Sequence, residues 1–289
     1  ATRRGSTRTT TDTWACHDRS VPDLLRTVTA IITEVTEELI VPRWRALEAG
    51  DIAEKEPGDV VTVADLEAER ALTPRLAELV SGSAVVGEEA VAADPSVVAA
   101  IGEADDVWIV DPIDGTGNFA AGSPDFGVMV AQVARGEIVR SWIHLPIRGE
   151  TFLAERGAGA TLNGDRLALD DDHVDPQAIT GVVKTRFLPA DVRVLVERGI
   201  SRVGPLDPST ICSAVEYGRL ASGDLDYVLY WRTYPWDHAP GTLLVQEAGG
   251  VAKRVEGDDY RVGDERTGLL VTRGNATWDL TRSTLLADL

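Results

Sequence analysis

The sequence predicts an α+β protein whose main element is an antiparallel β-sheet. Two stretches with apolar residues at helical spacing come first, near residues 21–40 and 62–79. Short segments that alternate apolar and polar residues then follow one another between residues 126 and 154, separated by turn residues. In the second half, helical and strand-like segments alternate. We therefore expect two early helices to cover a mainly antiparallel sheet, with a smaller α/β layer packed beside it.

Size and charge limit the possible functions. The 289 residues are 44% hydrophobic, enough to bury a large core in one large domain or two smaller ones. The net charge of −19 argues against nonspecific binding to nucleic acid or to an anionic membrane surface. The same acidic field would repel an anionic substrate, so a phosphate substrate would need metal ions at its site. No apolar run approaches the ~20 residues of a membrane span.

The cysteine content and the N-terminal sequence both bear on the compartment in which the protein is expected to reside. Cys16 and Cys212 are the only cysteines, which excludes a disulfide framework and fits a reducing compartment. Arg3 and Arg4 are not followed by the apolar segment of a signal peptide. We therefore expect a cytoplasmic protein.

Three regions are expected along the chain. Residues 1–19, rich in Thr, Ser and Arg without periodicity, predict a flexible leader. Residues 20–172 predict the α+β part with the antiparallel sheet, and residues 173–289 predict the smaller α/β part. The acidic run from Asp170 to Asp172 between them is interpreted as a solvated surface loop.

The helices of the first part are predicted from apolar spacing. The first should span residues 21–40, with Ser20 as its N-cap. Residues 50–58 predict a polar loop, and the second helix should begin near Thr62. Its buried face should hold Leu66, Leu72, Leu76 and Leu79.

Strands are expected where apolar residues alternate between turn signals. Arg135-Gly136-Glu137 and Asn163-Gly164 mark tight turns, and the second suits a type I′ hairpin. The predicted strands cover residues 83–86, 108–110, 126–133, 138–145, 151–154, 179–184 and 225–230. The helices of the second half are expected over residues 189–198, 212–222 and from just after Asp237 to the C-cap at Gly249-Gly250.

The stretch from Trp108 to Phe119, WIVDPIDGTGNF, carries the most specific chemical signal. A short buried strand is expected to end in a turn that holds two carboxylates, Asp111 and Asp114, with a proline fixing φ between them. Glycines such as Gly115 let the backbone approach a ligand, and free N–H groups at a helix start favour an anion. Hard divalent cations prefer carboxylates and carbonyls, so this pattern indicates phosphate chemistry at a metal. The alternative is an Asp-rich turn without a metal.

A second polar segment, KEPGDVVTVAD, lies at the start of the second predicted helix. It contains Lys55, Asp59, Thr62 and Asp65. Asp59 or Thr62 could cap the helix, and Asp65 could complement its dipole. A functional role requires these side chains to meet the other acidic motifs.

Two further acidic positions have both a structural and a functional interpretation. Glu88 and Glu89 follow a predicted strand, and they form a solvated turn unless they converge on Asp111. Asp237 is either an N-cap or a metal ligand, and His238 beside it is interpreted as a surface residue.

Together these segments resemble the inositol monophosphatase family of magnesium-dependent, lithium-sensitive phosphomonoesterases. The resemblance covers about residues 22–288. It rests on KEPGDVVTVAD, GEE, DPIDGTGNF and WDHAPG with the later EAGG, four motifs in the family's order. DPIDGT with GEE upstream and WD downstream is a highly specific combination. The resemblance implies a layered αβαβα sugar-phosphatase fold and hydrolysis of a small phosphate monoester by a metal-activated water.

It also implies a metal ligand set. Glu88, Asp111 and the Ile113 carbonyl would hold one Mg²⁺, and Asp111, Asp114 and Asp237 would hold a second. Glu88 could assist a third ion through water. Two or three ions are therefore expected, with Mn²⁺ as a possible substitute and with Ca²⁺ and Li⁺ as inhibitors.

The resemblance assigns the catalytic water to Thr116 and Glu88. Thr62 and Asp65 would orient Thr116, and Lys55 would lie near the metal-bound waters. The chemistry implied is direct hydrolysis, with no covalent phosphoenzyme.

Substrate contacts are where the sequence departs from the family. The backbone N–H groups of Gly115 and Thr116 would bind phosphate. The family's Glu that contacts inositol ring hydroxyls is replaced by Tyr230, and the turn at residues 209–214 is altered. Arg232 could pair with a second anionic group on the substrate, or it could be a surface residue.

The natural substrate therefore stays open. An inositol-phosphate-like, polyol or sugar phosphate is expected, and histidinol phosphate, fructose 1,6-bisphosphate and 3′(2′),5′-bisphosphate nucleotides are alternatives. A different class, a non-catalytic dimeric interaction protein on the same fold, would be favoured by loss of a metal ligand. Family analogy implies a homodimer.

Overall fold

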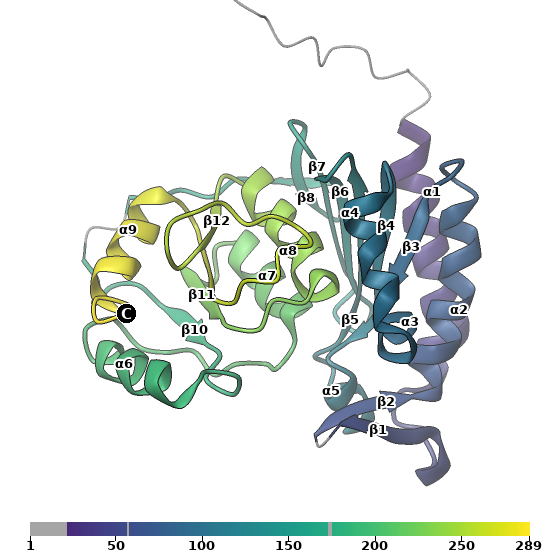
Figure 1. Cartoon of the computed structure of the whole chain (residues 1–289), viewed down its shortest axis with the longest axis horizontal. Coiled ribbons are helices and arrows are strands. Elements are labelled where there is room, and N and C mark those ends of the chain that lie inside the picture. Colours follow the sequence, from purple (N-terminus) through teal and green to yellow (C-terminus); the bar gives the residue numbers. More distant parts are fainter. Residues whose placement is uncertain (1–21, 57, 173–174) are drawn as a thin grey trace, which may run out of the picture.

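The computed structural model describes residues 22–56, 58–172 and 175–289, and it shows five layers of alternating helices and sheets. From one side to the other, they are α1 with α2, a seven-stranded sheet, α7 with α8, a four-stranded sheet, and α6 with α9 (Figure 1). The α+β class and the layered αβαβα order are thereby confirmed. The predicted leader and the Ser20 N-cap lie outside the described residues.

The seven-stranded sheet has the order β3-β4-β5-β6-β7-β8-β9. Only β3 and β4 run parallel, and every other neighbouring pair is antiparallel, as the run of alternating segments predicted. The strands are β3 (Ala84–Gly87), β4 (Asp106–Asp114), β5 (Gly127–Ala134), β6 (Glu137–Leu145), β7 (Glu150–Glu155), β8 (Gly159–Leu162) and β9 (Asp165–Leu167).

Two tight hairpins set the register of this sheet. Arg135 and Gly136 join β5 to β6, and Asn163 and Gly164 join β8 to β9. All four residues have positive φ, between 51° and 92°. A two-residue loop with both residues in the left-handed region is the type I′ geometry predicted at Asn163-Gly164.

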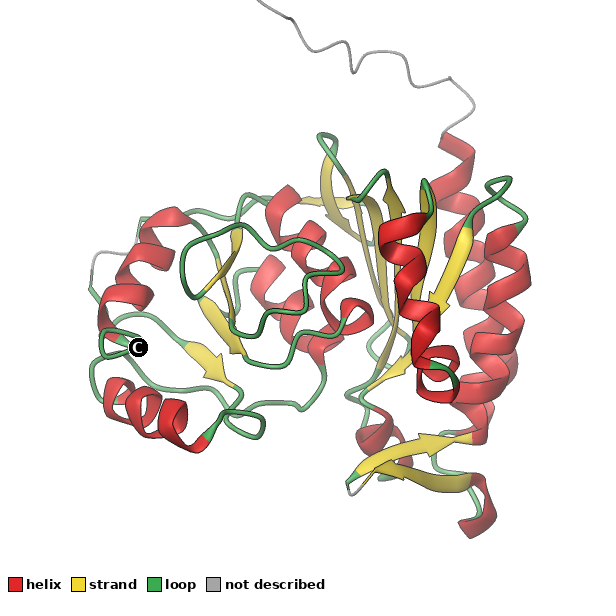
Figure 2. Cartoon of the chain, viewed as in Figure 1, coloured by secondary structure: helices red, strands yellow, loops and turns green. Residues whose placement is uncertain are grey.

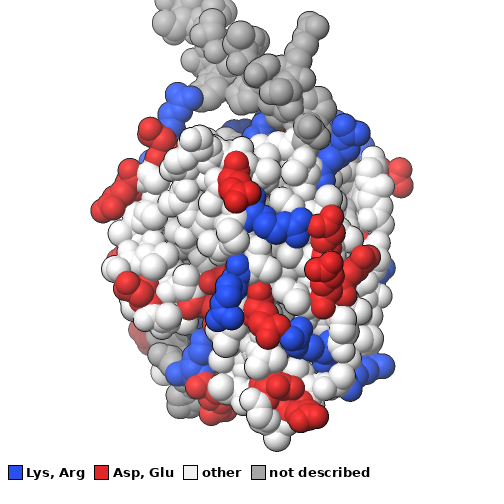
Figure 3. Space-filling view, turned by 90° about the vertical axis from the view of Figure 1, so that its right-hand side faces the viewer, with Lys and Arg blue, Asp and Glu red and all other residues white. Residues whose placement is uncertain are grey.

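The outer helices α1 (Pro22–Val35) and α2 (Val63–Ala77) pack on one face of the sheet, as expected. The helical region that begins with α1 continues as a π-helical turn, so the α-helix is shorter than the predicted span 21–40. Leu66 is 43% exposed, so its predicted burial is wrong, whereas Leu72 and Leu76 are fully buried. The outer face mixes acidic and basic side chains without a large patch of one sign (Figure 3).

The predicted polar loop at residues 50–58 is wrong. A 3₁₀ turn (Ala49–Asp51) leads into an antiparallel hairpin of β1 (Ile52–Glu56) and β2 (Asp59–Thr62). Most of its described side chains are at least partly exposed, so the hairpin lacks the apolar alternation from which strands are recognised. An Arg186 Nη2 group donates to the Gly58 carbonyl oxygen at 2.9 Å, which ties the hairpin to the second half of the chain.

The four-stranded sheet, in the order β10-β11-β13-β12, lies between two helical layers (Figure 2). Helices α7 and α8 separate it from the large sheet, and α6 and α9 cover its outer side. The elements are β10 (Gly181–Val183), α6 (Ala190–Ile200), α7 (Ser213–Ala221), β11 (Tyr227–Tyr230), α8 (Pro235–Glu247), β12 (Val251–Arg254), β13 (Leu269–Thr272) and α9 (Asn275–Thr284). Shorter helices are α3 (Glu88–Ala93), α4 (Ala100–Glu103) and α5 (Thr116–Ala120).

The connection between the sheets contains the acidic run that was interpreted as solvated. That interpretation is wrong for Asp171, whose carboxylate accepts hydrogen bonds from the N–H groups of Ala276 and Thr277 at the start of α9. Asp170 pairs with Arg273. A division of the chain near Asp172 stays our proposal. In the three described ranges, none of the helices combines the length and apolar character of a bilayer span.

Candidate active site

Strand β4 carries the two carboxylates of the central motif. The strand does not end before Asp111, as predicted, but pairs with β5 through Asp114. Asp111 lies opposite Met129 and Asp114 opposite Gly127, so the register shifts between them. Pro112 cannot donate to the ladder, and an irregularity is where a proline fits inside a sheet. This bulge turns both carboxylates toward one place.

Helix α8 brings the third carboxylate to the same place. Carboxylate oxygens of Asp111, Asp114 and Asp237 lie within 4.8 Å of one another. Asp237 lies in the first turn of α8, which begins at Pro235. The predicted helix start after Asp237 is therefore wrong: the helix begins three residues earlier, at Pro235, and proline is favoured at a first helical position.

The electrostatics of this carboxylate cluster favour a bound cation. Burial raises the pKa of Asp111 well above its usual value, and the charges of Glu88, Asp114 and Asp237 raise it further. Burial and the neighbouring Asp114 raise the pKa of Asp237 in the same way. Oxygen donors packed this closely are the ligand set of a hard divalent ion, so the residues present fit the metal that the sequence predicts.

Asp114 is fixed from the far side by the turn before α7. Its Oδ2 accepts a hydrogen bond from the Ala214 N–H at 2.6 Å and one from the Cys212 thiol at 2.9 Å. Burial and the neighbouring Asp114 carboxylate raise the pKa of the Cys212 thiol well above its usual value, so the thiol stays protonated and acts as a donor.

Glu88 lies beside the carboxylate cluster but outside its 4.8 Å group. It is the first residue of α3, and not part of the solvated turn that was the alternative. The Lys55 ammonium lies 2.7 Å from Glu88 Oε1 and 2.8 Å from Glu89 Oε1. Burial acts to lower the pKa of Lys55, but both carboxylates raise it above its usual value. The structure thus brings Lys55 to the acidic motifs.

A chain of hydrogen bonds joins Thr116 to the start of α2. Thr116 Oγ1 lies 3.0 Å from Asp65 Oδ1 and 2.9 Å from the Ile113 carbonyl oxygen. Asp65 Oδ2 accepts from the Thr62 N–H at 2.8 Å and from its hydroxyl at 2.5 Å. Thr62 is also the N-cap of α2 in a capping box with Asp65, so the capping interpretation is confirmed beside the long-range contact.

Asp65 is almost completely buried. Burial raises its pKa from 3.8 to about 6, although the hydrogen bonds from Thr62 and Thr116 oppose the rise. The carboxylate is therefore ionised at neutral pH and acts as the acceptor of the Thr116 hydroxyl.

Gly115 lies between Asp114 and Thr116 and packs closely against Cys212 in the turn before α7. Its φ of 85° lies in the left-handed region, and a Cβ there would be 2.9 Å from the Asp125 carbonyl oxygen and 3.2 Å from Cys212 Cβ. Glycine is required at this position on both counts. A Cβ at Gly117 would meet nothing within 4 Å.

The predicted substrate contacts differ in their exposure. Tyr230 is buried, its ring stacks on Tyr217, and its hydroxyl has no hydrogen-bond partner in the described part of the chain. Arg232 is half-buried, and its guanidinium is 3.9 Å from the Phe187 ring centroid and 4.4 Å from that of Tyr234.

His238 is not a surface residue, so that interpretation is wrong. Its ring is fully buried and packs edge-to-face on Tyr230 at 4.7 Å. Its nitrogens lie 2.9 Å from the Tyr217 hydroxyl and 3.0 Å from the Arg232 carbonyl oxygen. Burial lowers the pKa of His238 to about 3, so the ring is neutral at pH 7.

Two charged residues near the carboxylate cluster were missed in the sequence. Lys184 follows β10, and its ammonium lies 2.9 Å from Oε2 of Glu216, which is fully buried in α7. The chain has only three lysines, and this one ends a predicted apolar strand. A rare lysine at the end of an apolar strand was the sequence signal that could have identified Lys184 as a candidate site residue.

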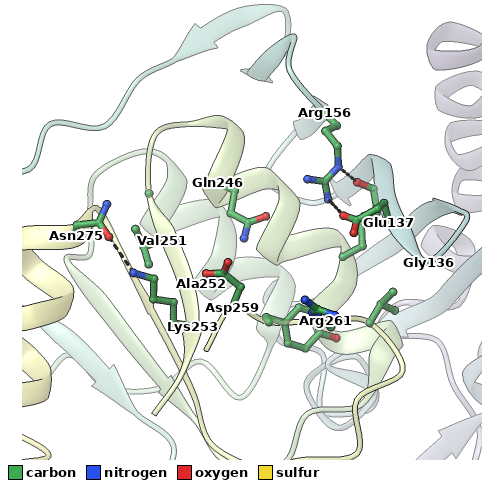
Figure 4. Close-up of a pocket in the computed structure, with 14 residues that line it drawn as sticks. Gly136, Glu137, Arg156, Gln246, Val251, Ala252, Lys253, Asp259, Arg261 and Asn275 are labelled. Carbon is green, nitrogen blue, oxygen red and sulfur yellow. Dashed lines mark hydrogen bonds and ion pairs between the residues drawn. The ribbon is translucent and has the colours of Figure 1, made fainter. Parts of the chain in front are cut away.

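A separate polar pocket of about 480 Å³ lies at the other end of α8 (Figure 4). Gln246 in the last turn of α8 lines it, and there Arg156 pairs with Glu137 while Lys253 bonds to Asn275. None of the predicted site residues lines this pocket.

A five-layer α+β fold with a carboxylate cluster at the end of β4 defines the sugar-phosphatase-like class. A sequence model of the inositol monophosphatase family matches residues 23–284. The chain belongs to the inositol monophosphatase family, and its enzymatic class is phosphoric monoester hydrolase.

Two relatives and one solved structure show what the chain is similar to. A fructose-1,6-bisphosphatase/inositol-1-monophosphatase of Thermotoga maritima is 29% identical over 72% of this chain and 77% of its own length. The Nus factor SuhB of Pseudomonas aeruginosa is 33% identical over 76% of this chain and 81% of its own. The solved structure of an IMPase from Thermotoga maritima superimposes with a TM-score of 0.74 and 25% identity, covering 92% of this chain and 97% of that one.

Proposed function

We propose that this chain hydrolyses a small phosphate monoester with Mg²⁺ bound by Asp111, Asp114 and Asp237. The observation that carries the proposal is the meeting of these three buried or half-buried carboxylates from β4 and α8 at one point. When bound there, Mg²⁺ would supply the positive charge that activates a water and stabilises the leaving oxygen. Glu88 and the Ile113 carbonyl would complete the ligands, and two or three ions are proposed in all.

The protein's own contribution is the placement of a water molecule. Thr116 Oγ1 has a single proton, which it donates to Asp65 or to the Ile113 carbonyl. Its lone pairs then remain free to accept a hydrogen bond from water. Asp65, held by Thr62, fixes this orientation, and Glu88 on α3 faces the same water in the proposal.

The substrate proposed is an inositol-phosphate-like or other polyol or sugar phosphate. The Gly115 and Thr116 N–H groups would bind its phosphate, with Lys55 near the metal-bound waters. Histidinol phosphate, fructose 1,6-bisphosphate and 3′(2′),5′-bisphosphate nucleotides are alternatives, and the bifunctional Thermotoga maritima relative supports keeping the bisphosphate among them.

The test is phosphate release from a panel of these monoesters, with Mg²⁺, with EDTA, and with Mg²⁺ plus Li⁺. We expect release only with Mg²⁺, partial replacement by Mn²⁺, and inhibition by Ca²⁺ and Li⁺. Equal release in EDTA would contradict the metal assignment. A cytoplasmic homodimer is part of the proposal, and its mass in solution can be measured in the same buffer.

A non-catalytic interaction protein is the second candidate function, and the likeness to Nus factor SuhB is what favours it. Against it stands the complete set of acidic residues, because Glu88, Asp111, Asp114 and Asp237 are all present. Absence of turnover across the panel together with absence of Mg²⁺ binding would favour this second function.

A further inference from the structure

Lys184 lies beside the carboxylate cluster on the side away from β4. Its ammonium is 2.9 Å from Glu216 Oε2, 3.4 Å from Ser213 Oγ and 5.1 Å from the Tyr230 ring centroid. Ser213 is followed by Ala214, whose N–H binds the Asp114 carboxylate. Lys184 therefore contacts the same turn that fixes a proposed metal ligand.

The Lys184–Glu216 pair presents its positive member outward. The Glu216 side chain has no exposed surface, and its other oxygen, Oε1, accepts the Ser209 hydroxyl at 2.7 Å. The Lys184 side chain keeps 19% of its surface exposed. Burial raises the pKa of both Asp114 and Asp237, and the charge of Lys184 acts against that rise, so its field reaches the carboxylate cluster.

This cation lies near a position where the resemblance implies a carboxylate and the sequence has an uncharged residue, Tyr230. The resemblance to the family places a Glu for ring hydroxyls at position 230, but here Tyr230 is buried and its ring faces the Lys184 ammonium. A carboxylate accepts hydrogen bonds from hydroxyl groups, whereas an ammonium can only donate. A substrate group that meets the Lys184 ammonium, in addition to Glu216, must therefore be an acceptor, and an anionic acceptor binds most strongly.

A second cation stands at the rim of the same region. Arg232 is connected to Tyr230 through His238, whose ring packs on Tyr230 and bonds to the Arg232 carbonyl. Two aromatic rings hold its guanidinium. It pairs with no carboxylate within ion-pair distance among the residues that the structure describes.

We propose that Lys184, assisted by Arg232, selects phosphate monoesters whose leaving alcohol carries a second anionic group, either a phosphate or a carboxylate. This inference rests on the proposed function and names its substrate class. The net charge of the chain is −19, so the protein as a whole repels an anionic ligand. Two cations near the carboxylate cluster are therefore a stronger indication that the substrate carries an anionic group there.

The test compares matched substrates that differ only in the second anion. Fructose 1,6-bisphosphate is compared with fructose 1-phosphate, and 2-phosphoglycerate with glycerol 2-phosphate, each as kcat/KM with Mg²⁺. The preferred pair distinguishes a phosphate from a carboxylate as the second anion. We expect the wild type to favour the doubly anionic member of at least one pair by about 10- to 100-fold, the scale of one charge-assisted hydrogen bond.

The decisive variant is the double substitution Lys184→Met/Glu216→Gln. Lys184→Met alone would leave Glu216 buried and unpaired, which can unfold the protein. The double variant removes both charges together, so it leaves no unpaired charge at position 216. A change in substrate preference can then be assigned to the loss of the Lys184 ammonium. Lys253→Met is the matched control, because it removes the same charge from the pocket at the far end of α8.

The expected result is loss of most of the preference in the double variant and its retention in Lys253→Met. A preference that survives in the double variant would overturn the inference and leave Lys184 as the structural partner of Glu216. Wild-type turnover of both members with equal efficiency would also overturn it, while the proposed function would stand. No turnover of any substrate would instead contradict the proposed function.

A binding measurement gives a readout apart from turnover. Calorimetry with Mg²⁺ and saturating inorganic phosphate, which occupies the proposed metal site, should show fructose 6-phosphate binding to the wild type more tightly than fructose does. The double variant should lose that difference. Equal affinity of wild type and double variant for fructose 6-phosphate would contradict the role of Lys184.

Discussion

The two sides of the candidate active site follow the family pattern to different degrees. On the side proposed to bind metal, Asp111, Asp114 and Asp237 converge. On the side proposed for the leaving alcohol, Tyr230 stands where the resemblance implies a Glu, and Lys184 follows β10 without belonging to any motif. We infer from this difference that the reaction and the choice of substrate are carried by separate residues, which can be altered independently.

The largest expected effect concerns the metal-binding side. Asp237→Asn should lower kcat/KM for every substrate by about 10³-fold, the scale of removing a preorganised charged group at a reacting centre. The loss should be the same for singly and doubly anionic substrates, measured as initial rates of phosphate release. Selective loss for one class would show that the two sides of the site are not separable.

The same variant also tests the electrostatics of the carboxylate cluster. Because the folded state raises the pKa of Asp237 above its unfolded value, its ionised form at pH 7 costs stability without metal. Asp237→Asn should therefore melt at a higher temperature than wild type in EDTA, and it should gain less from Mg²⁺. Asp279→Asn, at an exposed position on α9, is the control and should change neither value.

An intermediate effect is expected at the hydrogen-bond chain of Thr116. Asp65→Asn should lower kcat by about 10- to 100-fold, as for residues that orient a metal site from outside. In the wild type, protonation of Asp65 below its pKa of about 6 removes the acceptor of the Thr116 hydroxyl, so activity should fall as the pH drops from 7 to 5. A pH profile of kcat checks both statements.

The contribution of Asp65 to the stability of the wild type has the opposite pH dependence to its contribution to activity. The raised folded pKa of Asp65 gives a contribution that is present below pH 3.8 and lost as the pH rises through about 6. Asp65→Asn should remove that loss. An unchanged acidic limb of activity in Asp65→Asn would assign the limb to another group.

The smallest effect is expected at Arg232. Arg232→Ala should raise KM about tenfold for doubly anionic substrates only, since one partly exposed charge contact is lost. The Arg232 carbonyl that His238 binds is part of the backbone, so the buried ring should keep its place. An equal rise in KM for both substrate classes would make Arg232 structural.

The sequence predicted what short segments encode by themselves. The turn at Asn163-Gly164 needs only two residues with positive φ, and the cap at Thr62, one of the two caps that the sequence offered, needs only the first residues of the helix. The elbow from Asp111 to Asp114 was recognised in the same way, although the continued strand was not. These features depend on local geometry, which a linear pattern records.

What the sequence did not predict depends on contacts between distant segments. Lys184 meets Glu216 only because β10 and α7 pack together, and neither residue belongs to a motif. His238 was placed at the surface because its burial depends on Tyr217 and Tyr230 from two other elements. The β1–β2 hairpin was missed because its exposed strands have no apolar side to show.

One short connection could explain how such an enzyme acquires new specificity. Residues 184–187 follow β10; within them the Lys184 ammonium faces the Tyr230 ring, Arg186 binds the β1–β2 hairpin at Gly58, and Phe187 packs on the Arg232 guanidinium. No proposed metal ligand lies in this segment. Substitutions in this segment during evolution could therefore change substrate preference without altering the proposed metal ligands. Replacing the same four residues in the laboratory would be the corresponding way to redesign specificity.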